Sequence, residues 1–137
     1  MASQATRIFM AYLESKEMKV QILDDETNLI ALGLGLNNTQ LRLFIRFGDD
    51  DSDVHLEGRE FARIPSEQAG KALEICNSLN DAYRWVKFVW EENGDLACRC
   101  DGVIQLDSCA EETYELLARM AGIVDDAYPE IMKKLWA

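Results

Sequence analysis

Apolar residues recur with two different periods along the chain, and each change of period marks a predicted element. In residues 3–17 the spacing is that of a helix, with one apolar side formed by Ile8, Phe9, Tyr12 and Leu13. Ser3 is a suitable N-cap for this helix. In residues 18–22 apolar and polar residues alternate, which predicts a strand followed by a polar turn at residues 24–26.

Two further alternating segments predict a β-hairpin with a defined register. Residues 29–36 and 41–47 place apolar side chains at every second position, and Asn37-Asn38 lies between them. Asparagine tolerates positive φ, so this dipeptide suits a two-residue turn. The turn would set three apolar pairs opposite each other: Leu34 with Leu41, Leu32 with Leu43, and Ile30 with Ile45. A shift by one residue would break every pair, so we expect this register.

A fourth strand and a second helix follow. The strand is predicted to begin near Asp53, with Val54 and Leu56 directed inward. Residues 64–67 then open a helix, because proline is tolerated in a first turn. Its inner stripe is predicted to be Ala69, Ala72, Leu73, Cys76 and Leu79.

The turn signal Asn93-Gly94 predicts a second hairpin, between residues 85–91 and 96–101. A three-residue turn with a bulge at Gly94 would give three apolar pairs: Trp90 with Leu96, Phe88 with Cys98, and Val86 with Cys100.

A long final helix should start at Asp107 or Ser108. Its buried stripe is predicted to be Leu116, Leu117, Met120, Ile123, Val124, Ala127, Ile131 and Leu135. Pro129 is expected to kink or divide this helix, because proline cannot donate a hydrogen bond to the carbonyl of Asp125.

The predicted elements run in the order α-β-β-β-β-α-β-β-α. All links between strands are short, so we expect an antiparallel sheet with the helices on one face, which is an α+β fold. The chain has 137 residues, and 48% of them are apolar, enough for a sizeable core. With no repeat and no linker, residues 1–137 are predicted to form a single domain.

The charge balance argues against two classes of partner. The chain has 25 Asp and Glu against 14 Lys and Arg, for a net charge of −11. Such a surface repels phosphate backbones and anionic lipids, so we expect neither nucleic-acid nor membrane binding. A basic protein partner or plain solubility would explain the acidity. Residues 1–20 show no signal peptide, so we expect a cytoplasmic protein with reduced thiols.

Two candidate metal sites compete with simpler interpretations. The thiols of Cys76, Cys98, Cys100 and Cys109 could hold zinc, but their spacing on a helix and a strand favours a role in the core. Residues 49–60 carry carboxylates at four positions of a calcium loop. Val54 replaces the required glycine, however, and the flanks are predicted strands, so we favour a solvated hairpin tip.

No residue pattern predicts catalysis. His55 is the only histidine, and the alternation of its strand directs it away from Val54 and Leu56, toward solvent. We therefore expect an exposed histidine with no nucleophile beside it. The carboxylates form no isolated apolar-flanked pair, so the chain is not predicted to be an enzyme and implies no cofactor.

The second face of the first hairpin is half apolar. Phe44 would lie opposite Ala31, and Leu29 opposite Arg46. If Trp90 faces inward, Trp85 and Val89 face outward and could complete an apolar patch with Leu29, Ala31 and Phe44. Exposed patches of this kind mark protein contacts. We therefore expect a homodimer or an unidentified protein client on this face.

A small-ligand sensor is the alternative. It would need an apolar pocket with converging polar groups, which Asn77, Asn80 and Arg84 could supply. The two asparagines could instead close their helix and bond to neighbouring backbone.

The run Leu73-Glu74-Ile75-Cys76-Asn77-Ser78-Leu79-Asn80, followed by residues 83–88, resembles the YbjN-like family. That family shows a helix ending in Asn-x-Leu-Asn and then an aromatic-rich strand. Residues 126–129 are similar to the family's closing helix, and the order of elements agrees over nearly the whole chain. The resemblance implies a fold similar to the small acidic dimeric chaperones of type III secretion. It also implies a regulator of sensory transduction, with no catalytic residues.

Overall fold

The computed structural model describes residues 2–137 and contains the predicted elements in the predicted order. The helices and strands are α1 (Gln4–Ser15), β1 (Gln21–Asp24), β2 (Leu29–Gly35), β3 (Gln40–Phe47), β4 (Asp53–Arg59), α2 (Ala69–Ala82), β5 (Lys87–Trp90), β6 (Leu96–Val103) and α3 (Cys109–Leu135). A 3-10 turn, Ser66–Gln68, precedes α2. Ser3 caps α1 as predicted, its side chain accepting from the Thr6 amide.

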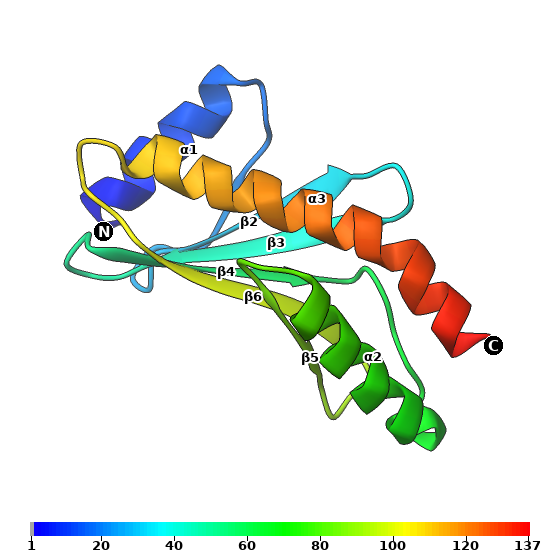
Figure 1. Ribbon diagram of the computed structural model, residues 1–137. Coiled ribbons are helices and arrows are strands. Elements are labelled where there is room, and N and C mark those ends of the chain that lie inside the picture. Colours follow the sequence, from blue (N-terminus) through cyan, green and yellow to red (C-terminus); the bar gives the residue numbers. More distant parts are fainter. Residues whose placement is uncertain (1) are drawn as a thin grey trace.

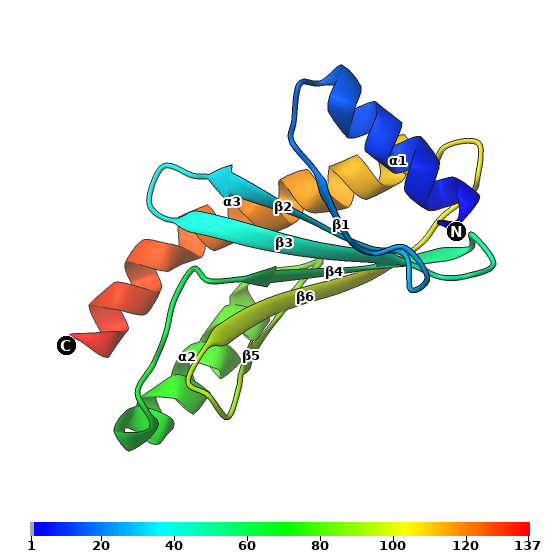
Figure 2. The same ribbon diagram turned by 180° about the vertical axis from the view of Figure 1, so that it is seen from behind.

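The strands form one antiparallel sheet in the order β1-β2-β3-β4-β6-β5. The helices pack against the same side of this sheet, with α3 running across it (Figure 1). Seen from behind, β3, β4 and β6 lie in front of α3 and α2 (Figure 2). The α+β fold with helices on one face is therefore confirmed. We call the side under the helices the inner face, and the opposite side the outer face.

The inner face forms the core, and two glycines let α3 approach it closely. A Cβ at Gly58 of β4 would lie 2.8 Å from Leu41 Cδ1 and 3.2 Å from the sulfur of Met120 on α3. A Cβ at Gly102 of β6 would lie 2.6 Å from Cδ1 of Leu116, also on α3. Both strands therefore present bare backbone where the helix crosses them.

The first hairpin has the predicted register, but not for the predicted reason. Leu34, Leu32 and Ile30 pair with Leu41, Leu43 and Ile45. Neither Asn37 nor Asn38 adopts positive φ, which was our reason for placing a turn there.

Instead, the turn residues bind α3. The Asn38 amide donates to the Asp125 carboxylate over 2.7 Å, and Asn38 Nδ2 donates to the Asp125 carbonyl over 2.9 Å. Pro129 has no amide hydrogen and cannot donate a hydrogen bond to that carbonyl. Pro129 was expected to kink or divide the last helix; the division is wrong, because α3 runs undivided from Cys109 to Leu135. Asn38 supplies the missing donor.

The second hairpin confirms the bulged turn. Trp90 pairs with Leu96 and Phe88 with Cys98, while Gly94 has φ of 95°. The pairing ends at Lys87, so the predicted pair of Val86 with Cys100 is wrong. Trp85, the residue before Val86, has φ of 76°, which turns the chain out of the extended conformation.

Two further details differ from prediction. The first strand spans residues 21–24 instead of 18–22. In α2 the buried stripe is Ala72, Ile75, Cys76 and Leu79, while Leu73 is 63% exposed. The observed positions follow the i, i+3, i+4, i+7 spacing of one helical face, which excludes residue 73.

Candidate partner-binding face

The outer face carries four of the five residues predicted for partner binding, Leu29, Ala31, Phe44 and Val89. Pairing across the sheet aligns Ala31, Phe44, Glu57, Arg99 and Lys87 in one row that crosses from β2 to β5. An apolar part on β2 and β3 therefore lies directly beside a charged part on β4, β6 and β5.

The apolar part consists of Leu29, Ala31 and Phe44, which we call the apolar strip. Ala31 is buried beside Phe44, while Leu29 and Phe44 are partly exposed. The Arg42 guanidinium lies 5.3 Å from the centre of the Phe44 ring, a cation–π distance. A shallow hollow of about 280 Å³ is lined by Leu29, Phe44, Arg46, His55, Glu57 and Arg59. The strip is thus accessible and is bordered by cations.

The charged part is a network of four side chains, Glu57, Arg59, Glu91 and Arg99, which we call the charged cluster. Arg99 donates to Glu57 and to Glu91, each over 2.9 Å. Arg59 pairs with Glu57 and donates to Glu91 over 2.7 Å. Each carboxylate therefore lies between two guanidinium groups, an arrangement that holds all four side chains in place.

This pairing changes the titration of the cluster. Partial burial favours the neutral form of Glu57, but hydrogen bonds and ion pairs with Arg59 and Arg99 outweigh burial. The pKa of Glu57 therefore lies below its ordinary value of 4.5. Hydrogen bonds from Arg59 to Glu91 raise the pKa of that guanidinium, against the effect of desolvation. Glu57 and Arg59 are accordingly ionised near neutral pH.

The formal charge of the outer face is balanced. Its basic side chains are Arg42, Arg46, Arg59, Lys87 and Arg99. Its acidic side chains are Asp24, Asp53, Glu57, Glu91 and Asp101, with Glu60 paired to Arg42 at the border. The whole chain has a net charge of −11. The acidic excess therefore lies on the helices and the loops.

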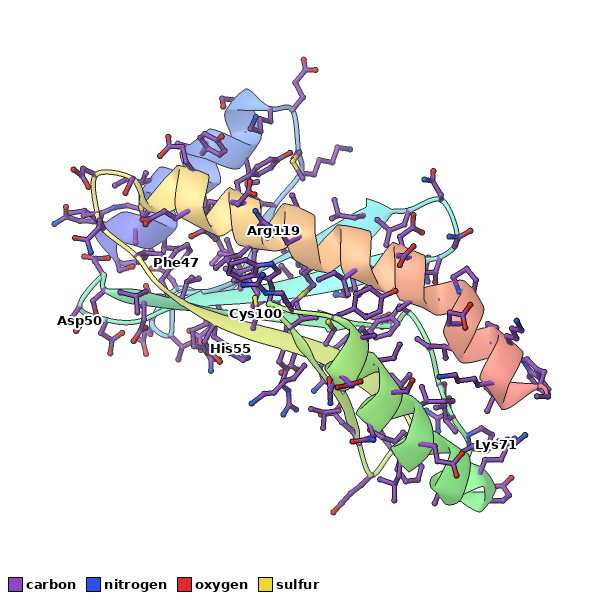
Figure 3. All side chains as sticks on the ribbon, viewed as in Figure 1. Phe47, Asp50, His55, Lys71, Cys100 and Arg119 are labelled. Carbon is purple, nitrogen blue, oxygen red and sulfur yellow. The ribbon has the colours of Figure 1, made fainter. Side chains whose placement is uncertain are left out.

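His55 lies on the outer face, as its strand pattern predicts. It points away from α3 (Figure 3), and its Nδ1 lies 2.7 Å from the Asp101 carboxylate. Its Nε2 lies 3.6 Å from Glu57. Cys98 and Cys100 lie on the inner face of the neighbouring strand, so the ring faces carboxylates and no thiol.

The structure separates Trp85 and Val89 from the apolar strip. Trp85 was predicted on the outer face, and this is wrong. Its left-handed backbone turns the indole toward the helices, where its ring lies 4.8 Å from the Arg119 guanidinium of α3. Figure 3 shows Arg119 and His55 on opposite sides of the sheet. Val89 does lie on the outer face, but on edge strand β5, with the charged cluster between it and Phe44.

The three residues considered for a ligand pocket take different partners. Asn80 Oδ1 accepts from the Phe88 amide over 2.6 Å, and its Nδ2 donates to the Phe88 carbonyl over 3.1 Å. Arg84 stacks on the Trp85 ring at 5.3 Å, and Asn77 is exposed. The expectation that an asparagine of this motif bonds to neighbouring backbone is confirmed for Asn80. The motif does not predict that the partner is Phe88.

The cysteines belong to the core, as we expected. Cys76, Cys98, Cys100 and Cys109 are free and buried. Burial raises the pKa of Cys100 to about 11 and raises that of Cys98 further, so these thiols stay protonated near neutral pH. Within residues 2–137 no group of three or more His, Cys, Asp or Glu side chains is arranged to hold a metal ion.

The acidic loop at residues 49–53 is not simply a solvated tip. Asp51 accepts from the Ala5 amide in the first turn of α1 over 2.9 Å, and Asp49 accepts from Asn28 Nδ2 over 3.1 Å. Carboxylates suit a helix N-terminus, where amides lack intrahelical partners. The loop therefore binds α1 to the sheet.

Within residues 2–137 no helix is both long and apolar enough to cross a membrane.

The fold of this chain also occurs in a known protein family. A search of curated proteins finds no match. The crystal structure of YbjN from E. coli is similar in fold, with a TM-score of 0.61 and 9% sequence identity over 91% of this chain and 92% of that one. The YbjN family, described as "Putative bacterial sensory transduction regulator", matches residues 8–131. This chain belongs to the YbjN family.

Proposed function

We propose that this chain is a non-enzymatic protein-binding domain with a chaperone-like or regulatory role. It binds a protein client through its outer face, and it acts as a homodimer. One observation carries the proposal: partly exposed Leu29 and Phe44 lie beside an array of paired Arg and Glu side chains, on a sheet face that no helix of residues 2–137 covers. The family description as a regulator supports the coarser part of this function.

Binding would use the two parts of the face differently. A strand or helix of the client places an apolar side chain in the hollow between Leu29 and Phe44. The charged cluster supplies the polar rim that surrounds such an apolar centre in protein interfaces. Because Glu57, Arg59, Glu91 and Arg99 already hold one another, they lose little further freedom when a client binds.

A Phe44→Glu variant tests this function. The substitution places a carboxylate in the apolar strip and should abolish client capture. Trp85→Glu is the matched control, because it removes an exposed aromatic ring on the helix side of the sheet. Both variants and the wild type would be cross-linked in native lysate and their captured proteins compared by mass spectrometry, after circular dichroism has confirmed folding. A client that survives Phe44→Glu but is lost in Trp85→Glu would contradict the proposal.

A further inference from the structure

The two edges of the sheet are treated differently. At the β5 edge, the Asn80 carboxamide of α2 binds both the amide and the carbonyl of Phe88. These are the groups that a neighbouring strand would bind, so the side chain occupies the place of that strand. Proteins commonly block an exposed edge in this way to prevent pairing with another chain.

The β1 edge lacks such a cover in the part of the chain that the structure describes. β1 pairs only with β2, and all four of its residues are exposed. Ile22 is 49% exposed and Leu23 is 40% exposed. An open edge that carries apolar side chains is suited to accept a further strand.

The charges around β1 indicate which strand fits. Exposed Lys19 lies before the strand, whereas Asp24 ends it and Glu26 follows it. The segment is therefore positive at one end and negative at the other. In an antiparallel pair with itself, the Lys19 end of each copy meets the acidic end of the other. In a parallel pair, like charges would meet.

We propose that a second copy of this chain pairs with β1, antiparallel about a two-fold axis, so that one sheet continues through both copies. The interface is isologous: Lys19 of each copy faces the acidic end of the other, and Ile22 and Leu23 lie near the axis. This inference rests on the proposed function only for the expectation that the chain self-associates.

The geometry has a consequence for client binding. A two-fold axis that relates antiparallel neighbours in a sheet is perpendicular to it, so both outer faces lie on the same side. The apolar strips, on β2 and β3, are the parts of that face nearest β1. The dimer therefore brings both strips close to the axis, where one client segment can reach both.

Charge reversal tests the dimer through a specific pattern. Lys19→Glu gives acidic groups at both ends of the segment, and Glu26→Lys gives basic groups at both ends. Each variant alone should therefore raise the dimer dissociation constant, by on the order of tenfold. An equimolar mixture of the two variants restores opposite charges at both contacts, so heterodimers should form with near wild-type affinity. Sedimentation velocity across a concentration series measures these constants for the full chain.

A matched control and three contrary outcomes complete the test. Lys87→Glu makes the same charge change at an exposed residue of β5, beside the edge that Asn80 blocks, and should leave the dimer intact. A wild type that stays monomeric at high concentration would overturn the inference, as would a mixture that associates no better than its components. A dimer lost through Phe44→Glu but not through Lys19→Glu would also overturn it. The association state decides this inference, whereas client capture decides the proposed function, so their failures are distinguishable.

Discussion

At the scale of single residues, the two asparagines of the Asn-x-Leu-Asn motif have different roles. Both are exposed, but Asn80 binds the backbone of Phe88, and Asn77 makes no such contact in the described part of the chain. The motif predicts that an asparagine near a helix end bonds to backbone. It does not predict which backbone, because Phe88 reaches Asn80 only after the chain has turned at Trp85. That turn depends on a left-handed tryptophan, for which the sequence has no signal.

Replacing Asn80 with alanine should lower the free energy of unfolding by about 1–3 kcal/mol, because both polar groups of the partly buried Phe88 backbone lose their partner. Asn77→Ala is the control. It brings the same change in helix propensity without removing that contact, so a change within about 0.5 kcal/mol is expected. Urea denaturation of both variants measures the difference. Equal effects at the two positions would show that the Phe88 contact contributes nothing.

At the scale of elements, hairpins were predictable and helix integrity was not. Alternation and turn signals fix a hairpin locally, which is why the observed pairs agree with the predicted ones except for Val86 with Cys100. In the undivided α3 the carbonyl of Asp125, which Pro129 cannot bond, accepts from the side chain of Asn38, a residue far away in sequence. Local pattern holds no information on such a contact, so a break at Pro129 was the reasonable expectation.

A double-mutant cycle should show that Asn38 compensates for Pro129. Asn38→Ala should destabilise the wild type by about 1 kcal/mol, because the Asp125 carbonyl loses its donor. In a Pro129→Ala background the new amide can bond that carbonyl within the helix, so the same substitution should cost less. Thermal or urea unfolding of the four proteins gives the coupling free energy. A coupling of zero would mean that the Asn38 bond and the proline are unrelated.

At the scale of the whole molecule, the outer face could be predicted in part. The pairing of Phe44 with Ala31 and of Leu29 with Arg46 follows from the hairpin register and is confirmed. The charged cluster was missed, because Glu57 and Arg59 lie on β4 while Arg99 lies on β6 and Glu91 directly after β5. β4 and β6 are neighbours in the sheet but not consecutive in the chain. The alternation of charged residues at 57, 59, 99 and 101 was the available signal for a polar outer face.

The charged cluster should make the stability of the molecule sensitive to acid. The folded-state pKa of Glu57 lies below its ordinary value of 4.5, so ionised Glu57 stabilises the fold above that pH. This stabilisation should disappear as the pH falls from 4.5 through the folded-state pKa. Glu57→Gln should be less stable than wild type at pH 7, and the difference should shrink toward pH 3.

Unfolding free energies measured from pH 7 to pH 3 test this dependence. Glu92→Gln, a change at an exposed glutamate, is the control and should follow the wild-type curve. A Glu57→Gln curve that runs parallel to wild type over the whole range would show that the cluster does not titrate with the fold.

The balanced charge of the outer face gives the molecule a long-range polarity. The helices behind the sheet carry nine acidic and five basic side chains, so that side is electronegative, whereas the front is close to neutral. An acidic neighbour is repelled least when it approaches the front. At physiological ionic strength this repulsion extends about 8 Å, far enough to orient a partner before contact. Concentrated salt should remove the orienting effect while leaving the short-range contacts in place.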